Sequence, residues 1–102
     1  MNNQTSVPPQ VKPHAINVQV RYPAAVEPYH DHLTPSTTVG ELKTLVLQAF
    51  GLTDGAVEQT GTVTYDLIYN RTKLTDPNET LGRLVGDHPE VKMALAQVIT
   101  QG

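Results

Sequence analysis

The sequence contains no cysteine and no tryptophan, and its aromatic residues are one phenylalanine and four tyrosines. The lack of cysteine excludes disulfides, thiolate catalysis and cysteine-type zinc sites. Lysine and arginine number 7 against 10 acidic residues and form no run, so neither nucleic acid nor an anionic membrane is an expected partner. No apolar stretch approaches the roughly 20 residues of a membrane span. Residues 1–6 lack the basic start and apolar core of a signal peptide, and we expect a cytoplasmic protein.

The residues that commonly carry catalysis are also few. The serines are Ser6, in a polar N-terminal stretch, and Ser36, beside a predicted helix start. A phosphate-binding loop needs glycines that follow a strand and open a helix, which Gly51, Gly55 and Gly61 do not do. We therefore predict that the chain is not an enzyme and binds no cofactor.

Length and composition predict one small domain, because 102 residues with 38% hydrophobic side chains can build one core but not two. Residues 1–14 are polar and punctuated by prolines, a composition typical of a disordered tail. We expect the folded domain to span residues 15–98. Residues 99–102 would then form a short C-terminal tail that ends in Gly102.

A capping box and an apolar stripe predict one helix. Residues 38–41 (TVGE) have the S/T-x-x-E pattern, in which the Thr38 and Glu41 side chains each accept from the other residue's backbone amide. Gly51 stands where a left-handed cap would end the helix, just after Phe50. Residues at helical spacing form one stripe that we expect to face the core: Val39, Leu42, Leu45, Val46, Ala49 and Phe50.

The remainder of the domain is predicted to consist of strands and turns. Residues 51–62 hold three glycines and few large apolar side chains, which predicts a loop. Thr80 is expected to cap a single helical turn through Leu84. Alternation of apolar and polar residues predicts strands at 16–21 and 91–96. Further strands are expected at 63–69, 72–74 and 26–33, where Pro28 indicates an edge position or a bulge.

His30-Asp31-His32 is the one metal-like cluster in the sequence. Histidines two residues apart on a strand share a face, so their two ring nitrogens could begin a zinc site. No third or fourth ligand is evident nearby in the sequence. We therefore interpret the cluster as a solvated strand face and predict no metal site.

The order of these elements and several local motifs resemble ubiquitin and its relatives. Residues 34–39 (TPSTTV) are similar to the proline-containing segment that leads into the ubiquitin helix. Residues 67–69 (LIY) are similar to the family's Leu-Ile-Phe strand, and residues 80–81 (TL) to the Thr-Leu that opens its short turn. Residues 91–95 fall in register with the last strand of ubiquitin. The resemblance implies an α+β fold, the ubiquitin-like β-grasp, in which a mixed four- to five-stranded sheet packs on one α-helix of a monomer.

The last residue carries the functional implication of the resemblance. Glycine has no Cβ, so a narrow enzyme tunnel can admit Gly102, and its carboxylate is sterically open. The resemblance implies a protein modifier whose Gly102 carboxylate is activated by an E1-like enzyme and passed through an E2-like conjugating enzyme to target proteins. A deconjugating protease would reverse the reaction. Ubiquitin ends in Gly-Gly after a basic tail whereas this sequence ends in ITQG, a looser pattern that suggests a bacterial ubiquitin-like modifier.

Two other functions remain open at this point. One is an unconjugated ubiquitin-like module that binds other proteins through its sheet. The other, less favoured, is a sulfur carrier in which the Gly102 carboxylate becomes a thiocarboxylate.

The resemblance also implies an interaction patch on the sheet. Ile68 matches the isoleucine at the centre of ubiquitin's apolar recognition patch, and strand alternation with Leu67 points it outward. Ala94 and Ala96 alternate with inward residues on the neighbouring strand. The predicted interaction patch is therefore Ile68, Ala94 and Ala96.

Lys12 and Lys73 are the possible acceptor lysines for linkages. Lys12 lies in the predicted tail, where an active site could reach it. Lys73 is one place beyond the position of ubiquitin's main chain-forming lysine. The interpretation we favour for both is a solvated surface charge.

Overall fold

A computed structural model describes residues 15–101, so the predicted tail at 1–14, Lys12 and Gly102 lie outside the described residues. Within the described part of the chain, neither helix is long and apolar enough to cross a membrane. The elements in chain order are β1 (Ile16–Arg21), β2 (Tyr29–Leu33), α1 (Val39–Phe50), β3 (Ala56–Glu58), β4 (Gly61–Tyr69), β5 (Thr72–Lys73), α2 (Leu81–Val85) and β6 (Glu90–Thr100).

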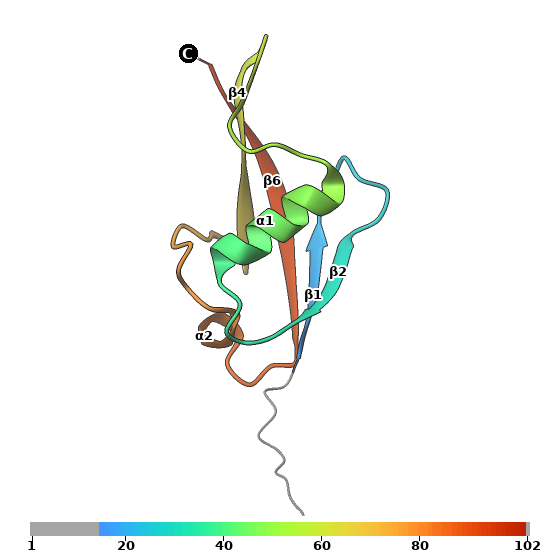
Figure 1. Ribbon diagram of the computed structural model, residues 1–102, viewed down its shortest axis with the longest axis vertical. Coiled ribbons are helices and arrows are strands. Elements are labelled where there is room, and N and C mark those ends of the chain that lie inside the picture. The colour runs from blue at the N-terminus through green and yellow to red at the C-terminus, as the bar shows by residue number, and fades with distance from the viewer. Residues whose placement is uncertain (1–14, 102) are drawn as a thin grey trace, which may run out of the picture.

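The strands form one mixed six-stranded sheet in the order β2-β1-β6-β4-β3, with β5 paired to β4. β1 and β6 run parallel, and the other pairs are antiparallel. Figure 1 shows α1 lying across one face of this sheet, in front of β6 and β1. The predicted α+β class and the β-grasp arrangement are thus confirmed, with β3 as a strand that the sequence pattern did not predict.

The capping box forms as predicted and sets the start of α1. The Thr38 hydroxyl accepts from the Glu41 amide at 3.1 Å, and the Glu41 carboxylate accepts from the Thr38 amide at 2.9 Å. Gly51 ends the helix in the left-handed conformation, with φ of 70°. The bounds of α1 therefore follow from local chemistry at both ends.

The core lies between α1 and the sheet, and the predicted apolar stripe of α1 is partly wrong. Leu45 and Ala49 are exposed, whereas Leu47 is buried. At about 100° per residue, Leu45 projects roughly 120° from Val39, outside the face that meets the sheet. The buried core consists of Ile16, Val18, Val20, Val39, Leu42, Val46, Leu47, Val63, Tyr65, Leu67, Leu81, Val85, Val91, Met93 and Leu95.

The predicted loop at 51–62 is largely a β-hairpin. β3 and the start of β4 pair around Gln59-Thr60, and β6 continues along β4 to the pair Thr62↔Thr100. Residues 99 and 100 thus lie in a strand rather than in the expected tail. We call residues 56–63 and 98–100 the arm; Figure 1 shows β4 and β6 continuing past α1 at this end of the sheet.

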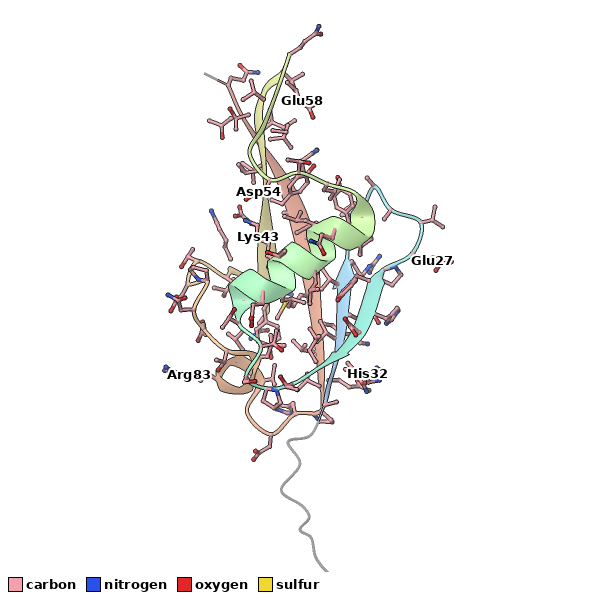
Figure 2. The ribbon with its side chains drawn as sticks, in the orientation of Figure 1. Glu27, His32, Lys43, Asp54, Glu58 and Arg83 are labelled. Atoms are coloured by element: carbon pink, nitrogen blue, oxygen red, sulfur yellow. The ribbon has the colours of Figure 1, made fainter. Side chains whose placement is uncertain are left out.

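A glycine permits the close approach of strands within the arm. Gly61 has φ of 130°, and a Cβ at this position would lie 2.4 Å from the Thr100 carbonyl oxygen. At the base of the arm, Asp54 accepts from the Tyr65 amide at 2.9 Å and pairs with Lys43 of α1 at 3.1 Å (Figure 2). The segment that leads into the arm is therefore fixed to the helix as well as to the sheet.

Candidate functional site

The face of the sheet opposite α1, which we call the outer face, carries the predicted interaction patch. Leu67 is buried against the core, so its neighbour Ile68 projects from the outer face. Ala94 and Ala96 project from the same face because they alternate with the buried Met93 and Leu95. Ile68 lies directly opposite Ala94 in the β4–β6 register, so the structure brings Ile68 and Ala94 together. Ala96 follows two residues along β6, and all three side chains are half-buried.

The outer face carries an apolar row, flanked by Arg21 and Asp66, beside a polar half. Val98 extends the apolar row along β6, where it lies opposite Thr64 and is 37% exposed. We call Ile68, Ala94, Ala96 and Val98 the apolar strip. The polar half covers β2, β1 and the start of β6, with six polar side chains in register: Asn17, Gln19, His30, His32, Glu90 and Lys92.

One ion pair borders the apolar strip. Lys73 lies opposite Ile68 on β5, and its Nζ is 3.7 Å from a carboxylate oxygen of Asp66. The Lys73 side chain is 59% exposed, so the pair is solvated and contributes little to stability. The Lys73 amine is accessible to solvent, and so to a partner protein or to an enzyme that would form a linkage at this lysine.

A hollow adjoins the apolar strip at Ala94. Its volume is about 330 Å³, and its lining includes Ala94 together with Tyr22 and Val26 of the β1–β2 connection. Val26 is 100% exposed, because β2 begins at Tyr29 rather than at Val26 as predicted. The sequence reasoning missed Val26, which no alternation pattern marks. It also missed Val98, which lies past the predicted end of the strand at Ala96, in a stretch where apolar and polar residues no longer alternate.

The side chains of β2 alternate between the two faces of the sheet. The Tyr29 hydroxyl donates to Asp31 at 2.6 Å on the helix side, and the His32 backbone amide donates to the other Asp31 oxygen at 2.8 Å. These hydrogen bonds hold the pKa of Asp31 below its usual value, and burial raises the pKa of Tyr29. His30 and His32 project from the outer face and are exposed. Among residues 15–101, no three potential ligands come together around a metal position.

Solved structures with similar folds are ubiquitin and ubiquitin-like domains. The ubiquitin of Caldiarchaeum subterraneum superposes with a TM-score of 0.64 at 22% identity, covering 86% of this chain and 99% of that one. The ubiquitin-like domain of yeast Ddi1 has a TM-score of 0.62 at 16% identity, covering 91% of this chain and 100% of that one. For the ubiquitin-like domain of Plasmodium falciparum Dsk2 the values are 0.61 and 19%, with coverage of 82% and 99%.

The similarity to these proteins was found by comparing structures and not by comparing sequences. No protein-family model matches the sequence, and no curated protein matches it. The sheet order, the single main helix on one face and the superpositions over almost the full length of each relative agree with one another. The chain therefore has the ubiquitin-like β-grasp fold.

Proposed function

We propose that the chain is a ubiquitin-like protein-interaction module that binds partner proteins through the apolar strip of its outer face. The observation that carries the proposal is the division of this face. Four apolar side chains adjoin one another on β4 and β6, with the charged Arg21 and Asp66 at their borders opposite Ala94 and Ala96, while a larger polar group covers β2, β1 and the start of β6. Apolar side chains are typical of the centre of a protein interface, with charged and polar groups at its rim.

The geometry also gives the strip an anchor and a recess. Ile68 is the largest side chain of the strip, and the hollow beside Ala94 can receive an apolar side chain of the partner. Complete burial of Ile68 would contribute up to about 1–2 kcal/mol, since a fully buried aliphatic side chain is worth about 1.5–3 kcal/mol and Ile68 is already half-buried. The Lys73–Asp66 pair at the border can set the orientation of a partner without adding much affinity.

Paired charge substitutions on the two halves of the outer face test this proposal. Ile68→Arg places a charge at the centre of the strip, while Gln19→Arg places the same charge on the polar half. Proteins captured by the wild-type chain from a lysate of the source cells, and then purified, are measured by calorimetry against each variant. We expect Ile68→Arg to weaken binding at least about 10-fold, a loss of about 1.4 kcal/mol, while Gln19→Arg leaves it within about 2-fold. Equal effects of both substitutions would refute the assignment to the strip.

Conjugation through Gly102 is a second proposal. It is supported by the likeness in fold to an archaeal ubiquitin and by the accessibility of a glycine carboxylate. One structural fact constrains it: β6 is paired with β4 up to Thr100, two positions before Gly102. An activating enzyme that draws in the C-terminal residues would have to open the last pairs of the arm, because an extended residue spans only about 3.3–3.6 Å.

The test of conjugation uses the chain with ATP and an E1-like enzyme from the same organism. Conjugation predicts a thioester adduct that is cleaved by reducing agent and is lost when Gln101 and Gly102 are deleted. A thiocarboxylate at Gly102, detected by mass spectrometry of the native protein, would instead indicate sulfur carriage. If no adduct forms, or if the adduct and partner binding are both unchanged by the deletion, conjugation through Gly102 is refuted and the interaction module stands.

A further inference from the structure

We propose that Zn²⁺ joins two copies of this chain at the open edge of the sheet, through His30 and His32 of each copy. Both imidazoles are exposed, and within residues 15–101 neither ring forms a hydrogen bond or an ion pair. They project from the same face, two residues apart, which is about 6.7 Å along a strand. Imidazole nitrogen is a preferred zinc ligand, with a Zn–N distance of about 2.0–2.1 Å.

A single copy supplies only part of the coordination that zinc requires. Structural zinc sites in proteins almost always have roughly tetrahedral coordination by four ligands. Residues 15–101 hold no group of three or more potential ligands, so this part of one copy offers the metal a pair of ligands, His30 and His32. A second copy with the same pair completes the set.

The backbone of β2 is arranged to pair with a second copy. In the described part of the chain, β2 is an edge strand whose one neighbour is β1. The Asn17 amide donates to the Pro89 carbonyl at 2.8 Å, toward β6, so the backbone groups of Asn17 do not bond to β2. Because backbone direction alternates along a strand, the residues opposite Asn17 and Gln19 point their backbone groups at the open edge. Those residues are His32 and His30.

Two-fold pairing about Asp31 therefore brings the histidines of two copies together. His30 of each copy then lies opposite His32 of the other, with backbone hydrogen bonds between them and Cα atoms about 5.5 Å apart. All four imidazoles project from the outer face, inside a rectangle of about 5.5 by 6.7 Å. The interface is isologous, as expected for a symmetric dimer.

Asp31 makes the pairing depend on the metal. In the two-fold arrangement the Asp31 carboxylates of both copies face each other on the helix side, and like charges directly opposite one another destabilise a strand pair. In the single copy an Asp31 oxygen also accepts from the His32 amide, which occupies a backbone donor of the open edge. Inward-pointing charge of this kind protects edge strands against unwanted pairing. Zinc ligation on the opposite face supplies the free energy that overcomes the repulsion between the two Asp31 carboxylates.

The outer face has room and polar neighbours for such a site. A hollow of about 510 Å³ extends beside the two histidines. Asn17 lies opposite His32 and Gln19 opposite His30, so their side-chain amides are placed beside the imidazoles on the same face. A metal-bound imidazole donates its second ring N–H to an acceptor, and these amide oxygens can serve as that acceptor.

Sedimentation velocity with ZnCl₂, MgCl₂ or EDTA tests the proposal. The wild-type chain is expected to double its mass with Zn²⁺ and to remain a single copy with Mg²⁺ or EDTA. His30→Gln and His32→Gln should each abolish the zinc-dependent dimer, whereas His88→Gln, at an exposed turn position outside β2, should leave it intact. Circular dichroism confirms that each variant is folded. Asp31→Asn should lower the dimer dissociation constant in Zn²⁺, because it removes the facing charges.

Other outcomes would overturn the proposal. A chain that remains a single copy in Zn²⁺, or that binds Zn²⁺ without dimerising, would refute the shared site. A zinc-dependent dimer that survives both His30→Gln and His32→Gln would place the metal elsewhere. Amide hydrogen exchange gives an independent readout, because dimerisation at β2 should protect the His30 amide that faces solvent in the single copy.

Discussion

Substitution of Gly61 by alanine should release the end of β6 from the arm. The added Cβ would lie 2.4 Å from the Thr100 oxygen, 3.0 Å from the Thr100 carbonyl carbon and 3.1 Å from the Gln101 Cα. All three atoms belong to the backbone, so no side chain can rotate away to relieve the contact. The positive φ of 130° is a second obstacle, because side-chain-bearing residues rarely adopt it.

The magnitude follows from these two effects. A strained backbone conformation costs about 1–3 kcal/mol. Relief of the clash requires the β6 backbone to retreat by about 1 Å, which breaks hydrogen bonds that act only within about 3.2 Å. Loss of the pairing at Thr62↔Thr100 and Val63↔Ile99 costs roughly 0.5–1.5 kcal/mol per hydrogen bond. Because the end of a strand can fray, we expect the clash itself to cost about 1–2 kcal/mol, mostly as local opening.

Gly55→Ala is the matched control. Gly55 also has positive φ, at 84°, but a Cβ added there would have no atom within 4 Å, so this variant carries backbone strain without the clash. Amide hydrogen exchange should accelerate about 5- to 30-fold at residues 98–101 in Gly61→Ala relative to Gly55→Ala. Urea denaturation measures the global loss. Equal exchange at these amides in both variants would refute the role assigned to Gly61.

Three further predictions concern stability and protonation. Thr38→Ala should lower the free energy of unfolding by about 1 kcal/mol in urea denaturation, because it removes the capping side chain of α1. Leu42→Ala should cost about 2–5 kcal/mol, since Leu42 is fully buried, whereas Leu45→Ala on the exposed flank should cost less than about 1 kcal/mol; similar losses would contradict the corrected helix face. Because the folded pKa of Asp31 is depressed, its contribution to stability is present above the unfolded value of about 3.9 and is lost as pH falls through the folded pKa. Tyr29→Phe removes the largest cause of the depression, so NMR titration should show the Asp31 pKa rise, and an unchanged titration would contradict the assignment.

The parts of the fold that follow from local chemistry could be predicted from the sequence. The capping box at Thr38 and the glycine at Gly51 fix the bounds of α1 without reference to the remainder of the chain. Strand alternation in β1 and in the first half of β6 gives the buried face because one side of each strand meets the core. For the same reason the outward direction of Ile68 and Ala94 could be derived from the sequence alone.

The arm could not be predicted in this way, because its strands lack the usual signal. Val57, Val98 and Ile99 are 82%, 37% and 47% exposed, so burial does not impose an apolar–polar pattern on this part of the chain. Gly61 is typical of loops in a sequence, yet here it allows β4 and β6 to approach closely. The fully exposed Val26 was missed for a related reason: its place beside the apolar strip depends on the path of the β1–β2 connection, which no local rule specifies.

The proposed zinc dimer and the proposed interaction surface would act together because of the sheet order. β2 forms one edge, and β1 separates it from the β6–β4 pair that carries the apolar strip, so dimerisation at β2 leaves the strip uncovered. In a two-fold strand pairing that places all four histidines on one face, the symmetry axis is perpendicular to the sheet, and the strips of both copies face the same side. Zinc would then convert a monovalent module into a bivalent one whose two sites are fixed relative to each other. For a surface that displays many partner molecules, such an arrangement can raise apparent affinity about 10²- to 10⁴-fold without any new contact, provided both sites engage together.

Surface plasmon resonance on dense and sparse layers of the partner protein should therefore show a zinc-dependent gain in apparent affinity only on the dense layer. The gain should vanish in His32→Gln, whereas Ile68→Arg should weaken binding on both layers.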